Sequence, residues 1–516
     1  MTRPSSLIGS AIVCIAILDA CAGSHALPAT STQQYDSRSA VYDDSPTPQL
    51  ATVVVHLSQV GPPVTRLVAG TTVPAWYNLT LSGISKAIVA ANVAITRFPG
   101  GAQVDIYDWR SGKDGPKGTP CAGNANPVSN IDTFMRDVAL PSQTQVALGV
   151  NYGSNPQCNG PNTPTNAAAF VSHVIKNYGA GIVSFWELGN EQYAPGSIDC
   201  RQPKCESSRD PDEFASHEPA FYDAMHAAGA QNVCIPVDAA NPKSRWNPVV
   251  FAKAKYDCAN IVYYPQRVTT SDSFLLYQAI PQLKAQIAAV KAELAAAGRA
   301  NTPILLSAIS SALGPYGKQS QSIVGALYAD MAIGEALDGG VAGMIWHIGV
   351  GSCDARSRGG DFARTVYGWQ NYGGAMIFSD GPANNCPVTA PRGTLLATAN
   401  AFIAAGAFVN AGGNMVGVTV RGNPDIRAYA SSKAIMLVNL SRTTGSDVTV
   451  SINGMSGGVE GTSGGGGGAI VDYDKGLYDE SKTGVWAAPR LSTLLPWKRR
   501  LHLRLRRWSV TVAPLV

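Results

Sequence analysis

Charged side chains are scarce in this sequence: Asp, Glu, Lys and Arg make up 14% of its 516 residues, against 45% hydrophobic residues. This composition excludes a coiled coil and a largely disordered chain. The length suffices for a large globular domain and a second, smaller one.

Several other patterns are missing as well. No Gly-rich phosphate loop follows the first predicted strand, which argues against a nucleotide-binding fold. No Cys/His spacing resembles a zinc site, so neither a metal nor a cofactor is expected. Beyond the N-terminal region, no apolar run is long enough to span a bilayer. Nothing in the sequence predicts an oligomeric state.

The net charge of +4 is unevenly distributed. One C-terminal stretch accounts for the excess and leaves the rest near neutral or slightly acidic: Lys498, Arg499, Arg500, Arg504, Arg506 and Arg507. Such a local excess does not indicate nucleic-acid binding. The segment from Leu501 to Arg506 alternates apolar and polar side chains, which is typical of an edge strand whose cations block aggregation.

The N-terminus has the pattern of a secretory signal peptide, here residues 1–26. Arg3 precedes an apolar core from Leu7 to Leu18. Leu18-Asp19-Ala20-Cys21 resembles a bacterial lipoprotein box, whereas Ser24-His25-Ala26 suits ordinary cleavage, and both sites stay open. We therefore expect export to the periplasm, the exterior or a lipid-anchored place at the envelope. Residues 27–50 are read as a linker.

Cysteine usage agrees with export. Eight cysteines follow the signal region: Cys121, Cys158, Cys200, Cys205, Cys234, Cys258, Cys353 and Cys386. An even number in an exported chain indicates disulfides. Cys200 could close a small loop with Cys205, and Cys234 could bridge to Cys258 because both begin consecutive predicted strands.

Strand and helix signals alternate between about residues 64 and 350. The predicted strands are Arg66–Gly70, Val93–Phe98, Gln145–Val150, Ile182–Leu188, Val233–Val237, Asn260–Tyr264, Ile304–Ile309 and Gly343–Ile348. The clearest helix, Ala279–Ala297, places Leu283, Ile287, Val290 and Leu294 on one face and ends before Gly298. Eight such repeats predict an α/β fold, a (β/α)8 TIM barrel over residues 51–405.

After about residue 405 the pattern changes to short strands separated by turns, as in Val416–Val420 and Ala434–Val438. This predicts a C-terminal all-β sandwich over residues 406–516. An early strand, Ala51–Leu57, precedes the barrel and is expected to join this sandwich.

The hexapeptide Trp186-Glu187-Leu188-Gly189-Asn190-Glu191 ends an apolar, β-branched strand where a loop begins. Barrel enzymes carry their chemistry at such strand ends. A carboxyl group beside an amide that can bind a sugar hydroxyl is what a glycosidase needs as its general acid. The alternative is a solvated or salt-bridged Glu191.

Together with Arg97-Phe98-Pro99-Gly100-Gly101, Gly149-Val150-Asn151-Tyr152-Gly153 and Tyr263-Tyr264, this motif resembles clan A glycoside hydrolases. The likeness covers roughly residues 50 to 516 and is strongest to the arabinofuranosidase, β-xylosidase and β-glucuronidase branches. It implies a carbohydrate ligand and a retaining mechanism with Glu191 as acid/base. It also implies sugar or nucleophile contacts from Arg97, Asn151, Asn190, Tyr264 and Trp346. Simpler alternatives are an Arg97–Glu187 ion pair, core packing for Trp346 and an ordinary strand-end role for Tyr264.

Two positions depart from that pattern. Ala308 stands where the family carries its nucleophilic glutamate, and Val262 where it often has a histidine. A methyl group cannot attack an anomeric carbon, and its neutrality removes a charge that would raise the Glu191 pKa.

Asp238, after the fifth predicted strand, is the best substitute carboxylate, and it would act on a water with inversion. Asp105 and Asp108 are weaker candidates for the same task. The sequence therefore leaves three functions open: an exported glycoside hydrolase, a carbohydrate-binding pseudoenzyme on the same scaffold, and a structural or adhesive surface protein.

Overall fold

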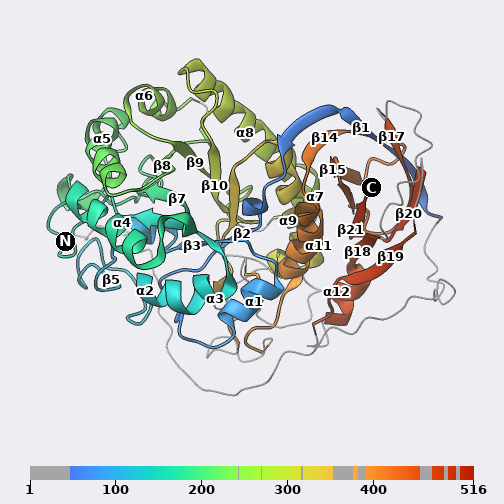
Figure 1. The fold of residues 1–516 in the computed structure, drawn as a ribbon, viewed down its shortest axis with the longest axis horizontal. Helices are drawn as coiled ribbons and strands as arrows, with labels where there is room; N and C mark the ends of the chain where they lie inside the picture. The colour runs from blue at the N-terminus through green and yellow to red at the C-terminus, as the bar shows by residue number, and fades with distance from the viewer. Residues whose placement is uncertain are drawn as a thin grey trace, which may run out of the picture.

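The computed structural model describes residues 47–515, apart from positions 242, 269, 315–317, 352–375, 382–390, 454–467, 482–485 and 496–499. The predicted signal peptide and most of the predicted linker lie outside the described residues, as do Cys353 and Cys386. Within the described part, no helix has the length and apolar character needed to cross a membrane. Figure 1 shows a strand barrel beside a curved β-sheet, with helices α9 (Ile323–Asp338) and α11 (Ala397–Ala411) between them.

Eight parallel strands close into a barrel, which confirms the predicted fold. In order around the barrel they are β2 (Gly70–Thr72), β3 (Ile95–Phe98), β6 (Gln145–Val150), β7 (Val183–Leu188), β8 (Val233–Pro236), β9 (Cys258–Tyr263), β10 (Ile304–Ile309) and β11 (Gly343–Trp346). The first strand begins later than predicted. Arg66–Val68 forms a short 3-10 helix (η1) instead, because the Thr65 side chain accepts a hydrogen bond from the Leu67 N–H.

Helices cover the outside of the barrel (Figure 1). They are α1 (Ile84–Ala90), α4 (Pro164–Tyr178), α5 (Pro211–Ala227), α6 (Trp246–Lys253), α7 (Asp272–Tyr277) and α8 (Ala279–Ala296), with a continuous helical run made of α2 (Ile131–Thr133), a π-helical turn (Phe134–Ala139) and α3 (Leu140–Ser142). Helix α8 buries Leu283, Ile287, Val290 and Leu294, as its sequence period predicts. It ends before Gly298, whose φ is +74°.

The inside of the barrel is layered, because every second side chain of a strand points inward. The lower layer is apolar and consists of Ile95, Ala147, Phe185, Cys234, Cys258, Leu305 and Ile345. The predicted disulfide between Cys234 and Cys258 is present and joins register partners on β8 and β9. Two residues further along β3, β7, β9 and β10, the inward positions are polar: Arg97, Glu187, Asn260 and Ser307.

The C-terminal β domain contains one nine-stranded mixed sheet in the order β19-β18-β21-β16-β15-β14-β1-β17-β20. Its strands are β1 (Gln49–Pro63), β14 (Asn414–Arg421), β15 (Ile426–Ser431), β16 (Ala434–Asn439), β17 (Ser446–Asn453), β18 (Gly468–Asp474), β19 (Arg490–Leu494), β20 (Arg500–Leu505) and β21 (Ser509–Pro514). Strand β1 runs between β14 and β17, so the chain passes through this sheet before it enters the barrel. The basic strand β20 lies at one edge.

Shorter elements complete the described chain: β4 (Tyr107–Asp108), β5 (Lys113–Asp114), β12 (Val350–Gly351), β13 (Phe378–Ser379) and α12 (Lys475–Ser481). Helix α9 is buried along almost its whole length because it packs between the barrel and the sheet. This explains why its sequence is apolar all round.

Candidate active site at the carboxyl ends of the barrel strands

A buried ion pair fills the polar layer of the barrel. The Arg97 Nε donates to Glu187 Oε1 at 2.9 Å and its Nη2 donates to Oε2 at 2.7 Å, with both side chains fully buried. Asn260 Nδ2 donates to the same Oε2 at 2.7 Å, and Ser307 Oγ donates to Asn260 Oδ1. Burial alone would lower the Arg97 pKa, but the adjacent Glu187 carboxylate raises it. Strands β3, β7, β9 and β10 are thus joined by one charged network.

Glu191 lies just beyond this network, where β7 has ended. Its backbone is left-handed, with φ of 49°. Such a conformation costs a non-glycine residue about 1–3 kcal/mol and persists only where its surroundings hold it. Here Ser197 Oγ donates to the Glu191 carbonyl oxygen at 2.6 Å. Backbone strain of this kind is often found at functional sites.

Two neighbours orient the Glu191 carboxyl group. Tyr193 OH donates to Oε1 at 3.3 Å, and Asn190 Nδ2 approaches Oε2 at 3.4 Å. The Asn190 Oδ1 in turn accepts from Arg97 Nη2 at 3.3 Å. Burial raises the pKa of Glu191 above its usual range; the two hydrogen bonds and Arg97 oppose this, and Asp238 adds to it. Glu191 therefore keeps its proton to a higher pH than a free glutamic acid.

The Asp105 side chain holds the end of β7 in place through backbone hydrogen bonds. Its carboxyl oxygens accept from the N–H groups of Asn190, at 3.0 Å, and Tyr152, at 3.3 Å. Gly189 passes so close that a Cβ atom there would lie 3.3 Å from Asp105 Oδ1, and its φ of 71° also favours glycine. Asp105 is thus an internal brace, which argues against its use as a substitute catalytic carboxylate.

Replacing Asp105 by asparagine should flatten the pH dependence of stability. Burial raises the pKa of Asp105 to about 8. An unfolded aspartate titrates near 4, so the folded state binds the extra proton between about pH 4 and pH 8, and its stability falls across that window as pH rises. The amide does not ionise and keeps an acceptor oxygen. Urea unfolding at several pH values should show a slope shallower by at most roughly 1.4 kcal/mol per pH unit.

Glu218 is a matched control for this effect, since burial raises its pKa to about 8 as well, away from the barrel mouth. Glu218→Gln should remove a similar slope. An unchanged slope in Asp105→Asn would show that Asp105 is ionised in the folded protein.

The remaining predicted site residues are placed as follows. Asp238 follows β8, is 8% exposed and lies within electrostatic reach of Glu191; burial raises its pKa. The Asn151 amide is used within the loops, because Nδ2 donates to the Tyr107 carbonyl at 3.1 Å and Oδ1 accepts from the Ser154 N–H at 3.1 Å. Asn151 therefore supports the loops beside the site, because both ends of its side-chain amide are hydrogen-bonded to them.

Ala308 lies at a β-bulge of β10. Opposite β9, Leu306 pairs with Ile261 and Ala308 pairs with Val262, so Ser307 is the extra residue. Ala308 is 4% exposed and belongs to neither apolar cluster of the barrel. The next residue, Ile309, pairs with Tyr263 on one side and Trp346 on the other, so Ala308 lies between the strand ends that carry Tyr264 and His347.

Trp346 faces away from the barrel mouth. It is fully buried, and its ring packs against Tyr328 of α9 and Phe402 of α11, with ring centroids at 6.0 and 6.4 Å. This packing leaves no ring face for a sugar, so the stacking role predicted for Trp346 does not fit the structure. The alternation of β11 explains it: Ile345 points inward and Trp346 outward.

His347 follows Trp346 and is an aromatic side chain at this mouth that sequence reasoning missed. Its ring contacts Tyr264 at 6.3 Å and Trp76 at 6.4 Å between centroids. Burial, with help from Arg97, lowers the pKa of His347 to about 4, so the imidazole is neutral at pH 7. Among the described residues, neither His347 Nδ1 nor Arg97 Nη1 has a hydrogen-bond partner. Because side chains alternate along a strand, the inward-facing Ile345 predicts that His347, two residues later, also faces inward.

Comparison with solved structures shows where this fold occurs. The chain resembles an α-L-arabinofuranosidase from Thermotoga maritima solved as an arabinose complex, with a TM-score of 0.63 and 15% identity, over 90% of this chain and 100% of that one. A family 44 xyloglucanase from Paenibacillus polymyxa gives a TM-score of 0.59 at 11% identity, over 91% of this chain and 100% of that one. A β-xylosidase from Caulobacter crescentus gives 0.57 at 13%, over 90% and 100%.

No family model matches the sequence, and no curated protein sequence matches it. The structural likenesses establish the fold that the sequence predicted, a TIM barrel with an added β domain. At these identities the chemistry has to be argued from the residues at the barrel mouth.

Proposed function

We propose that this chain is an exported glycoside hydrolase-like protein that acts on glycosidic bonds of extracellular glycosides or polysaccharides, with Glu191 as its proton donor. The observation that carries the proposal is the environment of Glu191: a carboxyl group at a barrel strand end, whose pKa burial raises and which Asn190 and Tyr193 orient. A general acid must carry its proton near neutral pH to protonate a leaving oxygen. The fold-wide likeness to glycosidases is consistent with this assignment.

The roles of the neighbouring groups follow from their contacts. Arg97 holds the Asn190 oxygen, so the amide is presented in one orientation beside the acid. Tyr264 and the neutral His347 offer ring surface and polar atoms to a sugar at the mouth. Ala308 supplies no nucleophile, so hydrolysis by this chain would use a water molecule, with Asp238 as the base and inversion at the anomeric carbon.

Replacing Glu191 by glutamine should lower the hydrolysis of glycosides with poor leaving groups by about 10²–10⁴-fold, because the amide cannot donate the proton. In the parent, kcat/KM should fall as pH rises through the raised Glu191 pKa, since the acid form is lost. Tyr193→Phe removes a hydrogen bond that favours the carboxylate, so this decline should move to higher pH. A panel of aryl glycosides assayed from pH 4 to 9 measures both. Equal rates for Glu191→Gln and the parent would reject Glu191 as the acid.

Ala308 also favours a second function, namely carbohydrate binding without turnover. An aromatic and polar pocket suffices to bind a sugar, whereas covalent catalysis needs a carboxylate at this position. Calorimetric titration with oligosaccharides separates the two. Saturable binding with no product after long incubation would support the pseudoenzyme, and product formation by the parent would reject it.

Export is proposed from the N-terminal pattern and from the disulfides. Mass spectrometry of the mature N-terminus would distinguish cleavage after Ala26 from an acylated Cys21. An uncleaved chain in the cytoplasm would overturn the proposal.

A further inference from the structure

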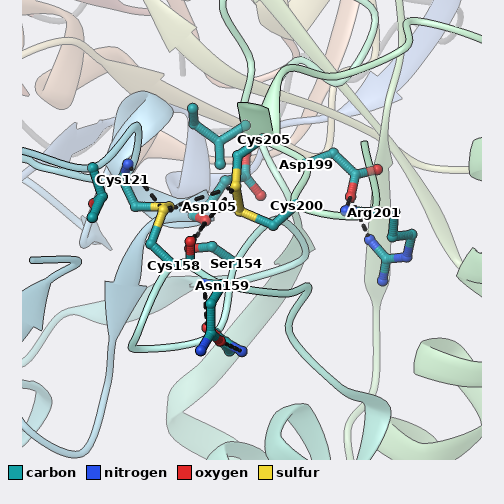
Figure 2. Close-up of a disulfide and its surroundings, with 12 residues drawn as sticks. Asp105, Cys121, Ser154, Cys158, Asn159, Asp199, Cys200, Arg201 and Cys205 are labelled. Carbon is teal, nitrogen blue, oxygen red and sulfur yellow. Dashed lines mark hydrogen bonds and ion pairs between the residues drawn. A yellow bond between two sulfur atoms is a disulfide. The ribbon is translucent and has the colours of Figure 1, made fainter. Parts of the chain in front are cut away.

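Four cysteine sulfurs gather at one point beside the barrel mouth (Figure 2). Cys121 is bonded to Cys158, and Cys200 to Cys205, the second of which was predicted from the sequence. The two disulfides lie against each other, with Sγ–Sγ distances of 3.7 Å between Cys121 and Cys200, 3.8 Å between Cys158 and Cys205, and 4.0 Å between Cys158 and Cys200. All four sulfurs lie within 4.8 Å of one another.

These separations match the dimensions of a tetrahedral metal centre. Zinc binds cysteine sulfur at about 2.3 Å, which places the sulfurs of a four-cysteine site about 3.8 Å apart. Three of the separations between the two disulfides already lie near this value. The two bonded pairs have to move apart, each by about 2 Å, to form the tetrahedron.

The surroundings also suit thiolates. The Cys121 N–H donates to Cys158 Sγ at 3.2 Å, and such a donor stabilises negative charge on sulfur. Cys121 and Cys205 are buried, whereas Cys158 and Cys200 are only half-buried, so a small reductant and an ion can reach part of the group. The third disulfide, Cys234 to Cys258, lies in the apolar lower layer of the barrel and is not part of this group.

We propose that Cys121, Cys158, Cys200 and Cys205 form a binding site for a soft divalent cation such as Zn²⁺ in the reduced protein, and that the two disulfides are the oxidised state of the same site. Each disulfide takes two electrons and two protons from a dithiol, which leaves as its own disulfide. The ion then displaces four protons from the four thiols and is held by four thiolates. This inference does not rest on the proposed glycosidase activity.

The site has a structural consequence because its ligands come from three loops. Cys121 follows β3, Cys158 follows β6, and the other two follow β7. The Cys200 N–H donates to the Gly153 carbonyl and the Asp199 N–H to the Cys205 carbonyl, each at 2.9 Å. The same β7 loop includes Ser197, which holds the Glu191 backbone. Both the disulfides and the bound ion cross-link these loops, whereas four free thiols do not.

The test begins with residues 27–516, produced without the proposed signal peptide in a reducing cytoplasm in zinc-supplemented medium and purified without oxygen. Metal analysis should find one Zn²⁺ per chain, and replacement by Co²⁺ should give the visible absorption bands of tetrahedral thiolate coordination. Oxidised protein should retain no zinc. Reduced protein that carries no more zinc than oxidised protein would overturn the proposal.

Matched variants locate the ion. Cys205→Ser should lose the zinc and the cobalt bands, whereas Cys234→Ser should keep both, because its sulfur lies outside the group. Circular dichroism of each reduced sample reports whether the barrel is folded. Zinc that is retained by Cys205→Ser, or lost equally from both variants, would show nonspecific thiol binding and reject the site. Resistance of the β7 loop to proteolysis should be high with zinc and low after its removal by a chelator.

Discussion

Replacing Ala308 by glutamate should raise the turnover of aryl glycosides on the order of 10³-fold or more, because it supplies the nucleophile that a two-step retaining reaction needs. Ala308 lies between the strand ends that carry Tyr264 and His347. Arg97 Nη1 is buried near them without a hydrogen-bond partner among the described residues. It can therefore donate a hydrogen bond to a carboxylate introduced at position 308. Proton NMR of the first-formed sugar should show retention at the anomeric carbon.

The control for this gain is Ala308→Gln, which adds the same volume without a charge. A rise in the glutamate variant alone assigns the effect to the carboxylate. Azide or formate added to the parent tests for the missing nucleophile without a buried substitution. A small anion can attack the anomeric carbon while Glu191 protonates the leaving oxygen. Unaided turnover by the parent at the rate of the glutamate variant would contradict this interpretation, and loss of that turnover in Asp238→Asn would then identify the base.

Replacing Arg97 by alanine should lower the free energy of unfolding by about 3–5 kcal/mol, which is the cost of leaving one partner of a buried ion pair without the other. Glu187 is fully buried and, among the described residues, would retain only the Asn260 amide as a donor. The loss also removes the hydrogen bond that orients Asn190. Urea unfolding at pH 7, followed by circular dichroism, measures the change.

Two variants separate the charge from the packing. Arg97→Lys keeps the charge but cannot donate from Nε and Nη2 together, so its loss should be intermediate. Combining Arg97→Met with Glu187→Leu removes both charges, and replacement of a whole buried pair by apolar side chains is often nearly neutral. A loss below about 1 kcal/mol in Arg97→Ala would show that the buried ion pair contributes little to stability.

The alternation of side chains along a strand explains the positions of Arg97 and His347. The motif Arg97-Phe98-Pro99 puts Arg97 and Phe98 on opposite faces of β3, and the structure places Arg97 inward and Phe98 in the outer core. The same rule, applied from Ile345, puts Trp346 outward and His347 inward. The family resemblance predicted that Trp346 stacks against the sugar. The alternation of side chains along β11 directs Trp346 outward instead.

Asn151 and the four-cysteine group illustrate what local patterns miss. The Asn151 amide is engaged by Tyr107 and Ser154, which reach it only through the folded loops. Cys121, Cys158, Cys200 and Cys205 have no metal-like spacing along the chain, because they come from three different loops. Their convergence is a property of loop packing that no short sequence motif contains.

The sequence by itself determined the eight-stranded barrel, the added β domain and the Asn190-Glu191 strand end, and it places an alanine at position 308. These features depend on hydrophobic period, turn residues and residue identity, all of which are local. The tertiary structure alone decided that Glu187 neutralises Arg97, that Asp105 braces Asn190 and that burial raises the Glu191 pKa. Those properties arise from contacts between strands far apart in the chain and from the exclusion of water around them, which residue identity does not specify.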